Sequence, residues 1–290
     1  MSKDKSKSKQ SEAKENGLPK FELFENAELN LLHARLKSAG FTEQTIQRRL
    51  QIPHVTAMLP SQYPVLLERM GRKPDPLSTL ISLFLIQSQV TRKAANEALT
   101  ADVVNGLLRA GLVRRGDSHA IAATVSIYPC SGYYFVTDHR FPPVSHEYCQ
   151  VPAQPVMYLG PSSYALAYLA PQVRRQARLL DVCTGSGVHA ILSSRKARKV
   201  IGVDLNPRAI EFARFNAALN GVGPQCDFRY GSLYQPVSQA DEHDGRFDLI
   251  AANPPFVPSP HVKKNRLLFR DGGSSGEEIL RPVLKARCQC

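Results

Sequence analysis

The spacing of apolar residues follows a helical period through the first part of the chain. Leucines at positions 29, 32 and 36 recur at helical spacing, and Gly40 separates this helix from a second one that ends near Leu50. Further helices are predicted at 76–86, 91–99 and 101–110, the last closed by Gly111. The N-terminal part of the chain is therefore predicted to be mainly helical.

Two apolar segments with strand character follow these helices. Residues 121–127 and 133–137 favour a β-hairpin, and three helices followed by a hairpin indicate a winged-helix-like module. Such a module could read nucleic acid through Arg92 and Lys93, or through the turn at 114–116. It could equally be an accessory packing domain. The pattern leaves both interpretations open.

From about residue 155 onward, short apolar strands alternate with helical segments. The strand candidates are 178–182, 200–203, 226–230 and 247–251, and the helices begin near Gly187, Pro207 and Glu277. Such alternation predicts a parallel sheet flanked by helices. The predicted fold class is α/β: a Rossmann-like parallel-sheet domain at 151–290, preceded by a mainly helical, winged-helix-like domain at 21–150. Residues 1–20 are expected to form a disordered basic tail.

Bulk composition narrows the class of protein. With 290 residues, 43% of them hydrophobic, the chain can bury a core of useful size. Its longest apolar stretch, 77–86, is interrupted by polar residues and falls short of the roughly 20 residues that cross a bilayer. The N-terminus has charge and no apolar segment, so it does not resemble a secretory signal. A cytoplasmic protein that does not associate with membranes is expected.

Charge and cysteine content bear on partners and metals. A formal net charge of +12 favours an anionic partner, RNA or a ribosome, although a basic tail and solvated faces would give the same charge. The six cysteines include no CxxC pair, which argues against a zinc site or a disulfide framework. No metal site is predicted.

A glycine-rich turn follows the first strand of the α/β segment. Residues Asp181–Gly187 (DVCTGSG) stand where an apolar strand passes into a helix, so a ligand can approach the backbone and its unpaired N–H groups. Asp204 ends the next strand, where a carboxylate can accept hydrogen bonds from both ribose hydroxyls of an adenosine ligand. Asn206 and Pro207 already supply the cap and first-turn proline of the following helix, which leaves Asp204 available.

A second motif, Asn253–Phe256 (NPPF), follows the strand at 247–251. Its two prolines lack N–H groups, so the Pro254 carbonyl and the Asn253 side-chain oxygen can both accept hydrogen bonds from an NH2 group. Two such acceptors favour the pyramidal geometry that makes a delocalised nitrogen nucleophilic, and Phe256 can stack on the planar group. Because the proton can leave after attack, catalysis depends on proximity and electrostatics rather than on a tuned base.

Taken together, these motifs resemble the class I, Rossmann-like S-adenosylmethionine-dependent methyltransferases, and within them the HemK/PrmC-like amino-methylating branch. The later segment Arg270–Arg281 (RDGGSSGEEILR) also looks like part of that family. The resemblance covers roughly residues 155–285 and implies S-adenosyl-L-methionine as cofactor. It implies cofactor binding by Asp181, Thr184, Gly185, Gly187, Asp204, Ser232 and Asn253, and catalysis by Asn253, Pro254 and Phe256. The segment 160–164 is expected to close over the methionine end of the cofactor.

The chain departs from the family pattern at two positions of the cofactor site. Cys183 stands where the family usually has its first glycine, and Ser232 stands where an acidic residue often binds the adenine amine. The chain also ends at Cys290, after the fourth strand, whereas the family fold continues through three more. A C-terminally truncated domain is therefore expected, with an exposed apolar edge at 247–251 that favours self-association.

The acceptor is left open by the motifs. A release-factor-type protein glutamine is the first expectation, which implies a protein substrate in the translation apparatus. An exocyclic amine of adenine or guanine in RNA or DNA is the alternative, favoured by basic clusters at 174–175, 195–199 and 263–266 that are expected near the site. An inactive binding protein that keeps a degenerate cofactor fold is a further alternative.

Overall fold

The computed structural model describes residues 18–71, 74–141, 152–170, 175–238, 247–259 and 267–286. The chain divides into two compact units. The N-terminal unit comprises Met1–Tyr128 and Asp138–Ala153, and the C-terminal unit comprises Pro129–Thr137 and Gln154–Cys290. Most of the tail predicted for residues 1–20 lies outside the described residues.

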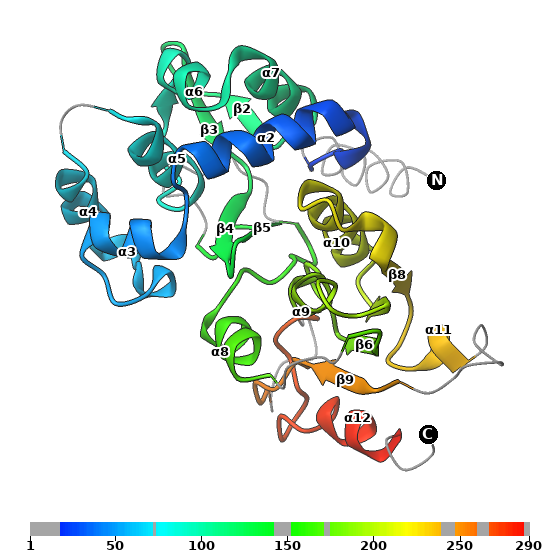
Figure 1. Ribbon diagram of the computed structural model, residues 1–290. Helices are drawn as coiled ribbons and strands as arrows, with labels where there is room; N and C mark the ends of the chain where they lie inside the picture. Colours follow the sequence, from blue (N-terminus) through cyan, green and yellow to red (C-terminus); the bar gives the residue numbers. More distant parts are fainter. Residues whose placement is uncertain are drawn as a thin grey trace, which may run out of the picture. The chain divides into compact units, whose positions relative to one another are not determined.

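The N-terminal unit is mainly helical (Figure 1), as predicted. Its elements are η1 (Phe21–Leu23), α2 (Asn26–Ser38), α3 (Glu43–Leu50), η2 (Val55–Ala57), η3 (Pro60–Gln62), α4 (Tyr63–Arg69), α5 (Pro76–Phe84), β1 (Val90–Thr91), α6 (Arg92–Leu99), α7 (Ala101–Arg109), β2 (Val113–Arg115) and β3 (Ala120–Ala123). The two helices divided at Gly40 and the three helices before residue 111 are confirmed. Apolar side chains from α2, α5 and α7 are fully buried, which explains the helical period of the sequence.

The strands that form the wing differ from the prediction. The sheet of this unit has the order β1-β3-β2, so its hairpin is formed by 113–115 and 120–123. The stretch 121–127 is divided between β3 and β4 (Ser126–Cys130), and β4 pairs instead with β5 (Tyr133–Thr137) in a separate two-stranded sheet. An apolar pattern indicates extended backbone but does not specify the partner strand, because pairing is a tertiary choice.

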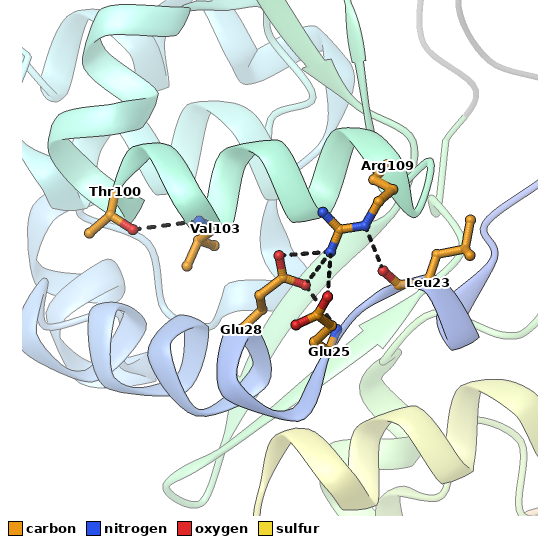
Figure 2. Close-up of polar contacts among 6 residues, drawn as sticks. All are labelled: Leu23, Glu25, Glu28, Thr100, Val103 and Arg109. Atoms are coloured by element: carbon orange, nitrogen blue, oxygen red, sulfur yellow. Dashed lines mark hydrogen bonds and ion pairs between the residues drawn. The ribbon is translucent and has the colours of Figure 1, made fainter.

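An ion-paired cluster joins α2 to α7, as Figure 2 shows. The Arg109 Nη2 atom lies 2.8 and 2.7 Å from the two carboxylate oxygens of Glu28, and its Nε donates to the Leu23 carbonyl at 3.0 Å. Gly106 makes room for this carboxylate, since a Cβ there would lie 2.6 Å from Glu28 Oε1. Thr100 caps the start of α7 through the Val103 N–H. The basic end of α7 is therefore used within the unit.

The C-terminal unit contains the predicted parallel sheet. Its elements, besides β5, are α8 (Pro161–Leu169), β6 (Arg178–Val182), α9 (Val188–Ser193), β7 (Lys199–Asp204), α10 (Pro207–Leu219), η4 (Gly223–Gln225), β8 (Cys226–Tyr230), α11 (Gln235–Ser238), β9 (Leu249–Ala252) and α12 (Leu280–Ala286). The strand order is β8-β7-β6-β9, and every neighbouring pair is parallel. The predicted α/β fold class is confirmed.

Successive side chains along a buried strand point to opposite faces of this sheet, so their contacts show which helices cover each face. Leu180 and Val182 of β6 pack in one core cluster with Val283 of α12. The intervening Asp181 accepts a hydrogen bond from the Ala190 N–H in α9, on the opposite face. Figure 1 accordingly shows α9 and α10 on one side of the sheet and α12 on the other.

The strand order reverses at β6, which has β7 on one side and β9 on the other. In an open parallel sheet, ligands bind at such a switch point, outside the carboxyl ends of the strands. The turns after β6, β7, β8 and β9 all emerge at that edge, and these turns carry the predicted motifs. Within the described residues β9 pairs only with β6, so it is an edge strand. Self-association through this edge remains a prediction.

Candidate functional site

A pocket of about 290 Å³ opens at the carboxyl edge of the sheet, at the switch point. Several predicted site residues line it: Thr184, Gly185, Asp204, Ser232 and Asn253. The other predicted site residues are not among its lining: Asp181, Gly187, Pro254 and Phe256. The structure therefore brings the cofactor motifs and the NPPF motif to one cavity, and it separates residues that face the cavity from residues behind it.

Asp181 lies behind the pocket and braces the turn. Its side chain is fully buried, and one carboxylate oxygen accepts hydrogen bonds from Thr184 Oγ1 at 2.6 Å and from the Ala190 N–H at 3.1 Å. The other oxygen has no hydrogen-bond partner among the described residues. Burial raises the pKa of Asp181 to about 7, and these two hydrogen bonds offset only part of that effect.

The two predicted glycines have different tasks. Both adopt a positive φ, 55° for Gly185 and 83° for Gly187. A Cβ on Gly185 would meet nothing within 4 Å, so its backbone lies open beside the pocket. A Cβ on Gly187 would lie 3.0 Å from the Ala213 Cβ, which shows that this glycine lets α9 pack closely on α10.

Cys183 places a side chain where the family pattern has a glycine. It adopts a positive φ of 59°, a conformation that L-residues rarely take, and it lines the pocket. Burial raises the pKa of the Cys183 thiol to about 12, and the nearby carboxylates of Asp204 and Asp181 add to the effect. The thiol therefore stays protonated beside the cofactor turn.

Asp204 is one of three carboxylates that line the cavity, together with Asp271 and Glu278. Its Oδ2 accepts the Gly185 N–H at 2.8 Å and its Oδ1 accepts the Asn206 N–H at 2.9 Å, which fixes its orientation. Burial raises its pKa, the charge of Asp181 raises it further, and the backbone hydrogen bonds oppose the shift. Among the described residues, no cation lies within ion-pair distance of either aspartate. A ligand in the cavity with hydroxyl or cationic groups could bind Asp204, whereas Asp181 lies out of its reach behind the turn.

The NPPF motif forms the rim of the pocket. The Asn253 side-chain NH2 donates to Ser162 Oγ at 3.4 Å, and its Oδ1 accepts no hydrogen bond from the described residues. Phe256 is 55% exposed outside the pocket lining. This arrangement leaves one acceptor and one aromatic face available at the rim.

The segment 270–281 holds the NPPF motif in place. The Val257 N–H donates to the Arg270 carbonyl, and the Gly272 N–H donates to the Val257 carbonyl, each at 3.0 Å. A Cβ on Gly272 would lie 2.8 Å from the Phe256 Cα, and one on Gly276 would lie 2.6 Å from the Phe256 carbonyl oxygen. The glycines of this segment are thus needed for its close approach to the motif.

Some residues of the pocket were missed by the sequence analysis. Leu205, which is 50% exposed, lines the cavity next to Asp204. The sequence could have indicated it, because it is an apolar residue between the end of the strand and the helix cap Asn206. His189 also lines it, and burial lowers the pKa of this imidazole to about 4, so it is neutral. Residues 155–159 and 267–269 complete the wall. Nothing local in the sequence marks these two segments. In the predicted segment 160–164, Ser163 lines the pocket.

Of the basic clusters expected near the site, the residues that the structure describes do not lie near it. Arg175 precedes β6, and the exposed residues of 195–199 precede or begin β7, so both clusters lie at the amino edge of the sheet. A strand the length of β7 separates that edge from the pocket by about 20 Å. Arg174 and the cluster at 263–266 lie outside the described residues. The prediction for the described residues was wrong because closeness in sequence does not show at which end of a strand a cluster lies.

None of the helices among the described residues has the length and apolarity that a membrane crossing requires.

Comparison with protein families identifies two matching segments. A domain of unknown function, DUF7059, matches residues 38–124. The family described as ribosomal protein L11 methyltransferase (PrmA) matches residues 162–254, which include the glycine-rich turn and end next to Asn253. The second match covers the turns at the carboxyl edge from β6 to β9.

Three relatives each match 35–37% of the chain. A protein of Methanocaldococcus jannaschii, provisionally named as an N5-glutamine methyltransferase, is 38% identical over 106 residues, which cover 35% of this chain and 50% of that protein. The release factor glutamine methyltransferase of Aliivibrio fischeri is 36% identical over 36% of each chain. The ribosomal protein uL3 glutamine methyltransferase of Bradyrhizobium diazoefficiens is 33% identical, over 37% of this chain and 35% of that one.

The matches thus span half of the first relative and little more than a third of the others. A solved structure of a ribosomal protein L11 methylase from Lactobacillus delbrueckii subsp. bulgaricus is 29% identical and covers 40% of this chain and 58% of that one, with a TM-score of 0.29. A score this low does not by itself establish a shared fold. The sequence matches confirm the resemblance to class I methyltransferases of the HemK/PrmC-like branch.

Proposed function

We propose that this chain binds S-adenosyl-L-methionine in the pocket at the carboxyl edge of its sheet and methylates the side-chain amide nitrogen of a protein glutamine. The observation that carries the proposal is the position of Asn253. Its Oδ1, which accepts no hydrogen bond from the described residues, lies at the rim of a cavity that is also lined by Gly185 and Asp204. The acceptor motif and the cofactor motifs thus share one cavity.

The residues of the pocket fit the cofactor. The open space over Gly185 admits a ligand to the backbone, and the Asp204 carboxylate can accept hydrogen bonds from two ribose hydroxyls. The carboxylates that line the pocket, with no lysine or arginine among the described lining residues, suit a ligand that bears a sulfonium and an ammonium group. Ser232 lines the same cavity and offers a hydroxyl to the adenine.

When bound, S-adenosyl-L-methionine supplies an electrophilic methyl group. The chain's own residues orient the nitrogen that receives it: Asn253 Oδ1 and the Pro254 carbonyl accept the two N–H bonds of the amide, and Phe256 covers its planar face. Ser162 fixes the Asn253 side chain by accepting a hydrogen bond from its NH2 group. Catalysis by these residues is positional and electrostatic.

A glutamine acceptor is supported by the names of all three relatives, and two of these names specify a release factor or ribosomal protein uL3. We therefore place the substrate of this chain in the translation apparatus, in the cytoplasm. A nucleic-acid amine has less support, because the described basic clusters lie at the opposite edge of the sheet from the pocket.

The test is transfer of a labelled methyl group from S-adenosyl-L-methionine to purified release factor, ribosomal protein uL3 and total RNA, with the wild type beside Asn253→Ala. We expect label on a glutamine, and a loss of rate of about 100-fold or more in Asn253→Ala, since one lost electrostatic contact to the reacting group typically costs that much.

Two outcomes would contradict the proposal. Label in RNA alone would replace the glutamine acceptor with a nucleic-acid amine. A wild-type chain that binds neither S-adenosylmethionine nor S-adenosylhomocysteine in calorimetric titration would exclude a methyltransferase activity of this chain altogether.

A further inference from the structure

Strand β5 is fastened to helix α10 by two asparagine side chains rather than by a further strand. The Val136 N–H donates to Asn216 Oδ1 at 2.8 Å, and Asn216 Nδ2 donates back to the Val136 carbonyl at 2.9 Å. Tyr134 and Asn220 form the same reciprocal pair at 2.9 and 2.7 Å. Each amide therefore imitates the paired N–H and C=O of a neighbouring strand.

Both asparagine side chains can pair with β5 because their spacing along the helix is close to the spacing of alternate residues along the strand. Residues four apart on a helix are separated by about 6 Å along its axis, and residues two apart on a strand by about 6.7 Å. Asn216 and Asn220 are four apart, and Tyr134 and Val136 are two apart. Both pairs can therefore form at once without strain in either element.

Asn216 makes one contact that Asn220 does not. Its Nδ2 also donates to the Ser186 carbonyl at 2.9 Å, and the Asn216 side chain is fully buried. The second donor of Asn220 is used within its own helix, on the Asn216 carbonyl at 2.8 Å. Only one of two otherwise equivalent clamps thus reaches the glycine-rich turn.

The contact to Ser186 completes the fixation of the turn. Ser186 lines the pocket, and the peptide unit that joins it to Gly187 is held at both ends. Asn216 donates to the Ser186 carbonyl, and the Gly187 N–H donates to the Thr184 carbonyl at 2.9 Å. The N–H of Gly185, in the peptide unit that joins Thr184 to Gly185, donates to Asp204. Because the glycines permit many backbone conformations, these bonds select one of them.

We propose that Asn216 is a positioning residue of the cofactor site: docked on β5, it holds the Ser186 carbonyl and so keeps the glycine-rich turn in the shape that binds the cofactor. The β4–β5 hairpin then contributes to cofactor affinity without touching the pocket. This inference rests on the proposed function for its ligand, but the fixation of the turn can be measured without one.

The experiment compares Asn216→Ala with the matched control Asn220→Ala. Both variants lose a clamp on β5 and should lose stability toward urea. Only Asn216→Ala should lose affinity for S-adenosylhomocysteine in calorimetry, by about tenfold for one buried hydrogen bond, with Asn220→Ala close to the wild type. Only Asn216→Ala should also speed native-state amide hydrogen exchange at Gly185 and Gly187 in the ligand-free chain.

Equal affinities and equal exchange rates in the two variants would overturn the inference. If Asn216→Ala does not fold, Asn216→Ser provides the test, since its shorter side chain donates a single hydrogen and leaves a smaller cavity. A wild type that binds no S-adenosylhomocysteine refutes the proposed function instead. In that case unchanged exchange of the turn in the Asn216 variants would still refute the positioning role.

Discussion

Asp75 of the N-terminal unit differs in its charged neighbours from Asp181 and Asp204 of the C-terminal unit. In the N-terminal unit, Asp75 caps α5 through the Ser78 N–H at 2.9 Å and meets Arg49 Nη1 at 2.6 Å, with 41% of its side chain exposed. In the C-terminal unit, Asp181 and Asp204 also accept backbone N–H groups, but among the described residues neither meets a cation.

The pKa values reflect this difference. Burial raises the pKa of Asp75, but hydrogen bonds from Ser78 and Arg49 outweigh it, so the net shift is downward. Burial dominates for Asp181 and Asp204, and their pKa values rise. Asp75, which stabilises the fold, is paired with an arginine. Among the described residues no cation balances the charge of Asp181 or Asp204, and burial of these carboxylates lowers the stability of the folded chain. Unmatched charge of this kind is typical of a site that receives a ligand.

The largest expected effect concerns Asp181. The pKa of Asp181 in the folded chain, about 7, lies above its value in the unfolded chain. The contribution of this carboxyl group to the free energy of unfolding is therefore complete below about pH 4 and is lost as pH rises through 7. Asp181→Asn mimics the neutral acid at every pH. We expect its free energy of unfolding to exceed that of the wild type by an amount that grows to about 4 kcal/mol by pH 8.

Urea unfolding of both proteins at several pH values between 4 and 8 measures this difference. The buried histidines titrate in the same range, but they are present in both proteins and cancel in the comparison. A difference that does not change with pH, or that shrinks as pH rises, would show that Asp181 is ionised in the folded chain.

The next effect concerns Asp204, a carboxylate that lines the cavity. Asp204→Ala should lower the affinity for S-adenosylhomocysteine by about 100-fold or more, because two hydrogen bonds to a charged acceptor are lost. Calorimetric titration measures it, with Asp75→Asn as the control that removes a charge from the other unit. Binding by Asp204→Ala within about threefold of the wild type would refute its ribose role.

The smallest effect concerns Asp75 itself. Asn also caps helices well, so Asp75→Asn removes mainly the partly exposed ion pair with Arg49. We expect a loss below about 1 kcal/mol at pH 7 that disappears at an acidic pH where the wild-type carboxylate is protonated too, because the folded pKa of Asp75 is lowered. Chemical denaturation at the two pH values tests this, and a loss that persists at low pH would show that the charge is not responsible.

The sequence determined the parts of this protein that depend on local pattern. Asp181–Gly187, Asp204 and Asn253–Phe256 could be found because each lies at the end of an apolar strand, and the carboxyl ends of parallel strands meet at one edge. Helix periodicity likewise indicated the helices of the N-terminal unit, since it reports which side of each helix is buried.

Only the tertiary structure decided which residues work together across long distances in the chain. It divided the predicted strand 121–127, so that its first part pairs with 113–115 and its end pairs with 133–137. It also placed the basic cluster at 195–199 at the far edge of the sheet, and it joined Val136, Asn216 and Ser186 by hydrogen bonds. A local pattern specifies how a segment is exposed and whether it is extended or helical. It does not specify the partner, because partners are selected by the packing of the whole unit, where each polar group must find its hydrogen bonds.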